Sequence, residues 1–147
     1  MTHDFPLNRE VVQTYLPHRD PMLFIDNVLE ADDTSIKART HVNPDWGFFK
    51  GHFPNLPIMP GVLMIETVAQ AGALIVCLQG GLRVDSFIAF AGVEEAKFRR
   101  TVRPGENMDI QAKILRHKRG YYKFQGYIDV NGERAVDVKF AATQMPM

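Results

Sequence analysis

The sequence has almost no cysteine, since Cys77 is the only one among its 147 residues. A single thiol cannot form a disulfide within the chain, so a reducing, cytoplasmic location is expected. Because Cys77 lies in an apolar stretch, we interpret it as a small buried hydrophobic residue rather than a nucleophile. The N-terminal residues also lack the charged-then-apolar pattern of a secretory signal, which agrees with that location.

Net charge is absent as well, because 17 basic residues balance 17 acidic ones. A neutral chain has no strong field to attract nucleic acid or a membrane surface, so neither is expected as a partner. Low-complexity segments, linkers and internal repeats are also missing. With an ordinary hydrophobic content of 46%, we expect one domain over residues 1–147 that buries a core of its own.

Two common kinds of cofactor site have no counterpart in the sequence. No pair of cysteine or histidine residues has the spacing of a zinc site. The adjacent glycines Gly80 and Gly81 lack the remainder of a phosphate-binding loop. We therefore expect neither a metal ion nor a bound nucleotide cofactor.

The sequence does contain one long apolar run. Three prolines between positions 54 and 60 prevent a helix from beginning before Pro60, which suits a first helical turn. From there to Leu78 the polar side chains are Glu66, Thr67 and Gln70. A helix that is apolar all round is either membrane-spanning or wrapped by other structure. A span needs about 20 clean apolar residues, so the glutamate in this run favours a central buried helix.

Glu66 and His52 are the candidate catalytic residues. A carboxylate on a buried helix is costly unless it is protonated, paired or needed. Glu66 is therefore either hydrogen-bonded at a subunit seam or a general acid, and Gln70 shares its helix face. His52 lies on a loop constrained by prolines, where an imidazole either caps the loop or acts as a general base near neutral pH. We interpret the remaining histidines as turn, strand or surface residues: His3, His18, His41 and His117.

The rest of the pattern predicts two strands before the long helix and four after it. Asn8 is expected to cap a short helix over residues 9–15. Alternating or branched and aromatic residues predict strands at 22–30, 35–42, 86–98, 108–116, 121–130 and 135–143. These elements indicate an α+β protein with a mostly antiparallel sheet that curls around the buried helix.

Three motifs resemble those of the FabZ-type (3R)-hydroxyacyl-[acyl carrier protein] dehydratases. They are Leu-Pro-His-Arg-x-Pro at 16–21, Phe-Phe-x-Gly-His-Phe-Pro-x-x-Pro-x-Met-Pro-Gly-Val-Leu-x-x-Glu at 48–66, and Phe-Ala-Gly-x-x-x-Ala-x-Phe at 90–98. The match covers essentially the whole chain in order. The sister FabA type carries an aspartate at the position of Glu66, so the FabZ type is the better match.

The resemblance implies a hot-dog fold, in which an antiparallel sheet wraps around a long central helix. It implies dehydration of (3R)-hydroxyacyl-[acyl carrier protein] to trans-2-enoyl-[acyl carrier protein] in fatty acid or related acyl-chain biosynthesis. His52 and Glu66 would be the catalytic pair, and the backbone N–H of Gly61 would hold the thioester carbonyl. It also implies a homodimer with active sites at the subunit interface, often assembled as a trimer of dimers. No cofactor is implied beyond the phosphopantetheine arm of acyl carrier protein, which carries the substrate.

The nine basic residues between positions 97 and 123 have two interpretations. They are solvated strand faces and turns, or they form a docking surface for the acidic acyl carrier protein. Arg99, Arg100 and Arg103 are the docking candidates, because they lie nearest to a predicted turn.

Two other functions stay open beside the dehydratase. One is a hot-dog acyl-thioesterase that hydrolyses an acyl thioester, and the other is a non-catalytic acyl-chain-binding protein. Hot-dog thioesterases commonly use a helix carboxylate without a partner histidine. The pairing of His52 with Glu66 therefore favours the dehydratase.

Overall fold

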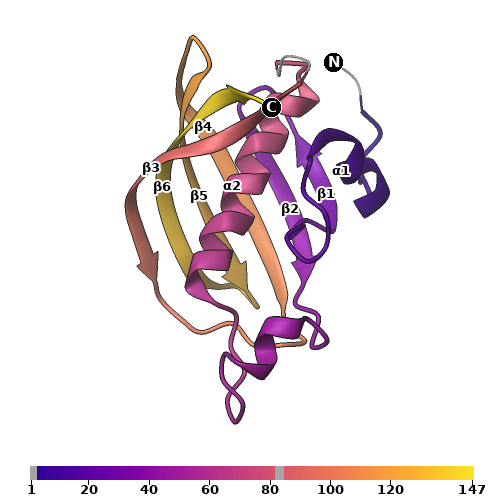
Figure 1. The fold of residues 1–147 in the computed structure, drawn as a ribbon, viewed down its shortest axis with the longest axis vertical. Helices are drawn as coiled ribbons and strands as arrows, with labels where there is room; N and C mark the ends of the chain where they lie inside the picture. Colours follow the sequence, from indigo (N-terminus) through magenta and orange to yellow (C-terminus); the bar gives the residue numbers. More distant parts are fainter. Residues whose placement is uncertain (1–2, 82–84) are drawn as a thin grey trace.

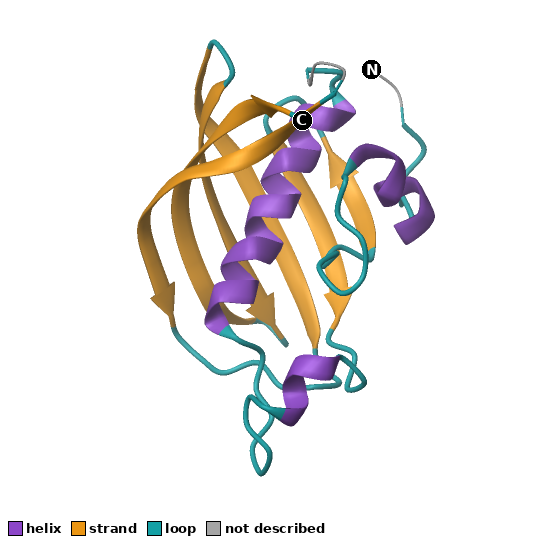
Figure 2. Ribbon diagram, viewed as in Figure 1, coloured by secondary structure: helices purple, strands orange, loops and turns teal. Residues whose placement is uncertain are grey.

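The structure, a computed structural model, describes residues 3–81 and 85–147. In these ranges one antiparallel sheet has the strand order β1-β2-β4-β5-β6-β3. The strands are β1 (Asn27–Ala31), β2 (Ser35–His41), β3 (Ser86–Phe98), β4 (Asn107–Lys118), β5 (Tyr121–Val130) and β6 (Glu133–Pro146). The long helix α2 (Gly61–Leu78) crosses the inner face of the curved sheet (Figure 1, Figure 2). This is the arrangement that the predicted hot-dog fold requires.

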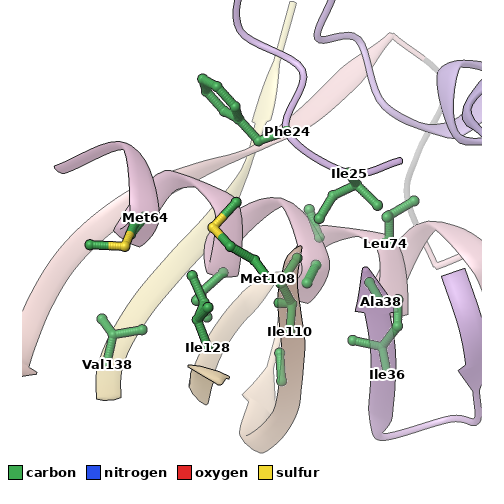
Figure 3. Close-up of a cluster of buried hydrophobic side chains, with 14 of the residues drawn as sticks. Phe24, Ile25, Ile36, Ala38, Met64, Leu74, Met108, Ile110, Ile128 and Val138 are labelled. Carbon is green, nitrogen blue, oxygen red and sulfur yellow. The ribbon is translucent and has the colours of Figure 1, made fainter. Parts of the chain in front are cut away.

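Helix α2 is the centre of the core. Its side chains Met64 and Leu74 lie among apolar side chains of the sheet, including Met108 and Ile110 of β4 (Figure 3). By length and composition alone α2 could cross a membrane, but a core helix passes the same test. In this fold 12 of its 18 residues are buried against the rest of the chain. The expected central buried helix is therefore what the structure contains.

A glycine in the sheet lets α2 approach closely. A β-carbon on Gly126 of β5 would lie 2.5 Å from Cγ1 of Val68 and 2.6 Å from the backbone oxygen of Gln111. Real β-carbons do not come this near to other atoms, so any larger residue at position 126 would have to push α2 and β4 away. Helix α2 thus packs closer to the sheet than any residue larger than glycine at position 126 would allow.

The N-terminal region is partly as predicted. Helix α1 (Arg9–Tyr15) begins at Asn8, whose side chain accepts a hydrogen bond from the N–H of Val11 as a cap should. The strand predicted at 22–30 is wrong in its first half, because β1 begins only at Asn27. Residues 22–26 run beside α2 instead (Figure 1), and their backbone groups bond to side chains. The N–H of Phe24 donates to Gln70, for example, rather than to a neighbouring strand.

The other elements follow the predicted pattern closely. Strands β3 and β5 have the predicted bounds, β2 ends one residue earlier than expected, and β4 and β6 are longer at both ends. A short 3-10 helix, η1 (Gly47–Lys50), replaces part of the loop expected before His52.

Strand β3 forms one edge of the sheet. It pairs with β6 along its length, and no other strand of the described ranges lies on its other side. Apolar side chains are exposed on it: Phe90, Val93 and Phe98. A long strand with a free edge and exposed apolar residues is a surface that proteins normally cover.

Candidate active site

His52 lies on the loop between η1 and α2, and this loop fixes its tautomer. The N–H of Ile58 donates to the backbone oxygen of His52 at 2.9 Å, and Nδ1 of His52 lies 3.1 Å from the backbone oxygen of Ile58. A carbonyl oxygen can only accept, so in the neutral ring Nδ1 carries the proton and Nε2 has the lone pair. The ring of Phe53 stacks on the imidazole, with 4.4 Å between centroids. The loop therefore holds His52 in the form that a general base needs.

The N-terminus of α2 leaves two backbone donors unused. The oxygen of Pro60 accepts from the N–H groups of Leu63 and Met64, and no side chain caps the helix. The N–H groups of Gly61 and Val62 have no acceptor in the part of the chain that the structure describes. Unpaired N–H groups and the helix dipole together favour negative charge at this position. The helix start can therefore stabilise an oxygen on which charge develops.

Glu66 lies one and a half turns into α2, and its carboxylate is held at one oxygen. Nε2 of Gln70 donates to Oε2 of Glu66 at 2.9 Å, which confirms that the two side chains share a face. Nε2 of His18 lies 3.3 Å from the same oxygen. The Glu66 side chain is 22% exposed, so it remains accessible from outside. Glu66 is thus held in place by Gln70 and is still accessible to another molecule.

Gln70 is the buried link between Glu66 and the N-terminal segment. Its side-chain oxygen accepts from the N–H of Phe24 at 2.9 Å, and its nitrogen also donates to the backbone oxygen of Met22 at 2.7 Å. Both hydrogens of the amide nitrogen and the amide oxygen are therefore in use. A group so fully bonded and only 1% exposed has one orientation.

His18 makes a contact that the sequence does not predict. Its sequence position predicts a place in the turn between two prolines, and the structure puts its imidazole against Glu66 as well. The turn itself is held by Arg19, whose guanidinium donates to the backbone oxygens of Gln13, Leu16 and His18. His18 and Glu66 are far apart in sequence, so spacing could not pair them. The available signal was that His18 belongs to one of the three motifs.

His52 and Glu66 do not meet within this chain. Over residues 3–81 and 85–147 no hydrogen bond or ion pair joins their side chains. His52 is bound to its own loop, and Glu66 is bound to Gln70 on α2. One copy of the chain therefore presents both groups without connecting them.

The predicted docking arginines differ in how free they are. Arg99 pairs with Asp137, and Arg100 pairs with Glu106 at 2.7 Å. Among the described residues, the Arg103 guanidinium has no hydrogen-bond or ion-pair partner. Arg103 is thus the one of the three whose charge is available to another molecule.

Within the described residues, the candidate residues coincide neither with a metal-binding cluster nor with the groove on the sheet. In the described part of the chain, no group of three His, Cys, Asp or Glu side chains could hold a metal ion. A groove of about 420 Å³ is lined by residues of β1, β2, β4, β5 and β6, and it includes neither His52 nor Glu66. Charged side chains of the groove pair with one another, such as Lys37 with Glu30 and Arg134 with Asp137.

A curved antiparallel sheet wrapped around one long helix defines a hot-dog protein. The FabA-like domain model matches residues 16–139, so the chain belongs to the FabA-like domain family. Relatives named 3-hydroxyacyl-[acyl-carrier-protein] dehydratase FabZ include one from Janthinobacterium sp. (strain Marseille), 41% identical over 90% of this chain and 86% of its own. Another, from Neisseria meningitidis serogroup C, is 39% identical over 93% of both chains. The predicted family resemblance is confirmed.

Solved structures share the fold. A dehydratase heterocomplex from Xenorhabdus doucetiae has a TM-score of 0.74 and 24% identity, covering 97% of this chain and 93% of that one. A mutant thioesterase from Pseudomonas aeruginosa has a TM-score of 0.68 and 14% identity, covering 96% of both chains. Both likenesses confirm the hot-dog fold, and at these identities they bear on the fold alone.

Proposed function

We propose that this chain catalyses the dehydration of a (3R)-hydroxyacyl-[acyl carrier protein] to the trans-2-enoyl-[acyl carrier protein], within one hot-dog domain spanning residues 1–147. The observation that carries the proposal is the tautomer of His52, whose Nδ1 is bonded to Ile58 so that Nε2 is left as a base. The names of relatives at 39% to 41% identity agree with this activity. A hydro-lyase needs such a base together with an acid and an oxyanion site.

Each step of the reaction has a residue to perform it. Nε2 of His52 removes a proton from C2 of the acyl chain, and the electron pair of that C–H bond forms the C2=C3 double bond. Glu66 gives a proton to the C3 hydroxyl, which departs as water when the C3–O bond breaks. The free N–H of Gly61 holds the thioester oxygen while negative charge develops on it. Only protons and water move, so the reaction as written uses no redox cofactor.

We propose that the working unit is a homodimer that shares its sites. The free edge of β3 and its exposed Phe90, Val93 and Phe98 offer a continuous surface for a second copy. His52 and Glu66 of one copy are not in contact, so a site that uses both calls for a group from a second copy. We also propose that three such dimers assemble into a trimer of dimers.

The substrate's carrier would dock on basic surface near the His52 loop. The N–H of Met59 donates to the backbone oxygen of Val102 at 2.7 Å, so the segment that bears Arg103 is bonded to that loop. Of the predicted docking residues Arg99, Arg100 and Arg103, the last is the leading candidate, since the first two are engaged in ion pairs. Acyl carrier protein, with its phosphopantetheine arm, is the proposed partner, and the cytoplasm is the proposed location.

Mass spectrometry of a 3-hydroxyacyl carrier protein incubated with the purified chain tests the function. We expect the acyl carrier protein to lose the mass of one water. Release of the free acid would instead identify the alternative, a thioesterase. No change in mass would leave an acyl-binding protein without catalysis and would overturn the proposal. His52→Ala serves as the matched control, because it removes the base and leaves α2 intact.

A further inference from the structure

The contact between His18 and Glu66 is not used by the reaction above. Nε2 of His18 lies 3.3 Å from Oε2 of Glu66, and Gln70 donates to that same oxygen. Two nitrogen groups from different parts of the chain therefore converge on one carboxylate oxygen. The other oxygen, Oε1, has no protein partner within the described residues.

The orientation of Gln70 is fixed by a group that can only donate. The N–H of Phe24 faces the side-chain oxygen of Gln70, so the amide cannot be turned around. Its NH₂ group therefore faces Met22 and Glu66, where it bonds to both. An N–H hydrogen accordingly always points at Oε2 of Glu66.

The second nitrogen of His18 indicates where that ring carries its proton. Nδ1 of His18 is buried and has no hydrogen-bond partner. A proton on Nδ1 would be a buried N–H without an acceptor, which is costly, whereas a bare lone pair there costs less. Because the chain itself covers this atom, neither solvent nor a second subunit can supply the missing acceptor. The proton therefore belongs on Nε2, which faces Glu66.

We propose that His18 is a positioning residue for Glu66: its Nε2–H and the Gln70 amide together occupy Oε2, which confines the transferable proton to Oε1. A carboxylate oxygen has two lone pairs in its plane. The Gln70 amide donates to one of them, and Nε2 of His18, 3.3 Å away, lies within reach of the other. A proton on Oε2 would then collide with a donor hydrogen. The proposal rests on the proposed dehydratase function, in which Glu66 must give its proton to the C3 hydroxyl.

His18 and Gln70 would orient the carboxyl group of Glu66 without taking part in the proton transfer. His18 is carried by a turn that Arg19 holds through three backbone oxygens, so its ring has a rigid base. Gln70 is buried on the same helix face as Glu66. Loss of His18 would leave Oε2 held by the Gln70 amide alone, with one lone pair open to a proton, which slows the proton transfer but leaves substrate binding intact.

Nitrogen-15 NMR of the imidazoles in the wild-type protein tests the proton's place directly. We expect the His18 signals, identified by their loss in His18→Gln, to show a neutral ring protonated on Nε2 at neutral pH. A ring protonated on Nδ1, or on both nitrogens, would overturn the proposal. This measurement does not depend on activity, so it separates a failure of this inference from a failure of the proposed function.

Kinetics of two substitutions test the role. His18→Leu removes the donor and should lower kcat roughly 10- to 100-fold with little change in KM, as loss of an orienting group typically does. His18→Gln keeps an N–H near the position of Nε2 and should restore most of kcat. His41→Gln, at an exposed histidine bonded to Asn107, is the matched control and should behave as the wild type. Wild-type kcat in a folded His18→Leu, or no recovery in a folded His18→Gln, would contradict the proposal.

Discussion

The ring of Phe98 lies directly over Gly61. A β-carbon on Gly61 would be 2.8 Å from Cε1 of this ring and 3.1 Å from Cζ. The last residue of β3 thus covers the first residue of α2, beside the helix's unused N–H groups. Phe98 is 52% exposed in one copy of the chain.

Gly61→Ala should therefore disturb activity more than folding. The added methyl group must displace the Phe98 ring or the helix start, and a misplacement of about 1 Å at a reacting group can cost ~10²-fold in rate. We expect a clear loss of kcat/KM with a nearly unchanged melting temperature. Phe98→Leu in the same chain should restore part of the loss, because it removes the clash. Strictly additive effects in this double-mutant cycle would show that the two residues do not interact.

A shared active site predicts that two inactive variants complement each other. We expect His52→Ala and Glu66→Gln to be inactive when each is assayed alone. After subunit exchange, a mixed dimer would hold one site with both His52 and Glu66 intact. Random exchange in a symmetric dimer makes half of the dimers mixed, so about a quarter of wild-type activity should return. Activity that stays at background after exchange is verified by mass spectrometry would place the whole site within one copy.

Much of the fold could be predicted because one pattern governs most of the chain. Strands β2 and β5 alternate apolar and polar residues, and helix α2 is one apolar run that begins after Pro60 and ends before Gly80 and Gly81. The segment 22–26 could not be predicted in this way. It is as apolar as a strand, but Gln70 and Thr40 supply its hydrogen bonds from elsewhere. A side-chain partner distant in sequence leaves no periodic signal.

The candidate site could be predicted only where its residues are neighbours in sequence. His52, Gly61 and Glu66 stand in one motif, on a loop and the helix that follows it. His18 comes from another part of the chain, and its contact with Glu66 depends on how α1 and its turn pack on α2. Similarly, Arg99 reaches Asp137 because β3 pairs with β6, and Arg100 reaches Glu106 across the β3–β4 connection, neither of which charge counting provides.

Because α2 packs very closely on the sheet at Gly126, Gly126→Ala should lower the free energy of unfolding strongly. The new methyl group would meet Val68 and the backbone oxygen of Gln111, and backbone cannot swing aside as a side chain can. Overpacking of this kind typically costs 1–3 kcal/mol, and we expect about 3 kcal/mol here. Gly47→Ala is the matched control: no atom lies within 4 Å of its β-carbon, so the change should stay below about 1 kcal/mol. Urea unfolding measures both, and equal midpoints would contradict the close contact.

Cys77 should make the fold less stable in alkali. Burial raises the pKa of its thiol from 9.0 to about 11. As pH rises through this window the unfolded chain releases the proton and the folded chain keeps it, so the free energy of unfolding falls. The slope from one such group is at most about 1.36 kcal/mol per pH unit.

Cys77→Ala should therefore flatten the dependence of stability on pH in this window. Burial also raises the pKa of Tyr122, and that residue adds an alkaline slope in both proteins. Urea unfolding between about pH 8 and about pH 11 gives the comparison. Parallel curves for the wild type and Cys77→Ala would show that the thiol titrates alike in both states.

Gly61 and Glu66 lie on the same helix, so the geometry of α2 fixes the distance between them. A helix rises about 1.5 Å per residue, so these positions are about 7.5 Å apart along its axis. Neither a moving loop nor a shift between subunits can alter this spacing within one copy of the chain. Helix α2 thus holds the free N–H of Gly61 and the carboxyl group of Glu66 at a constant separation.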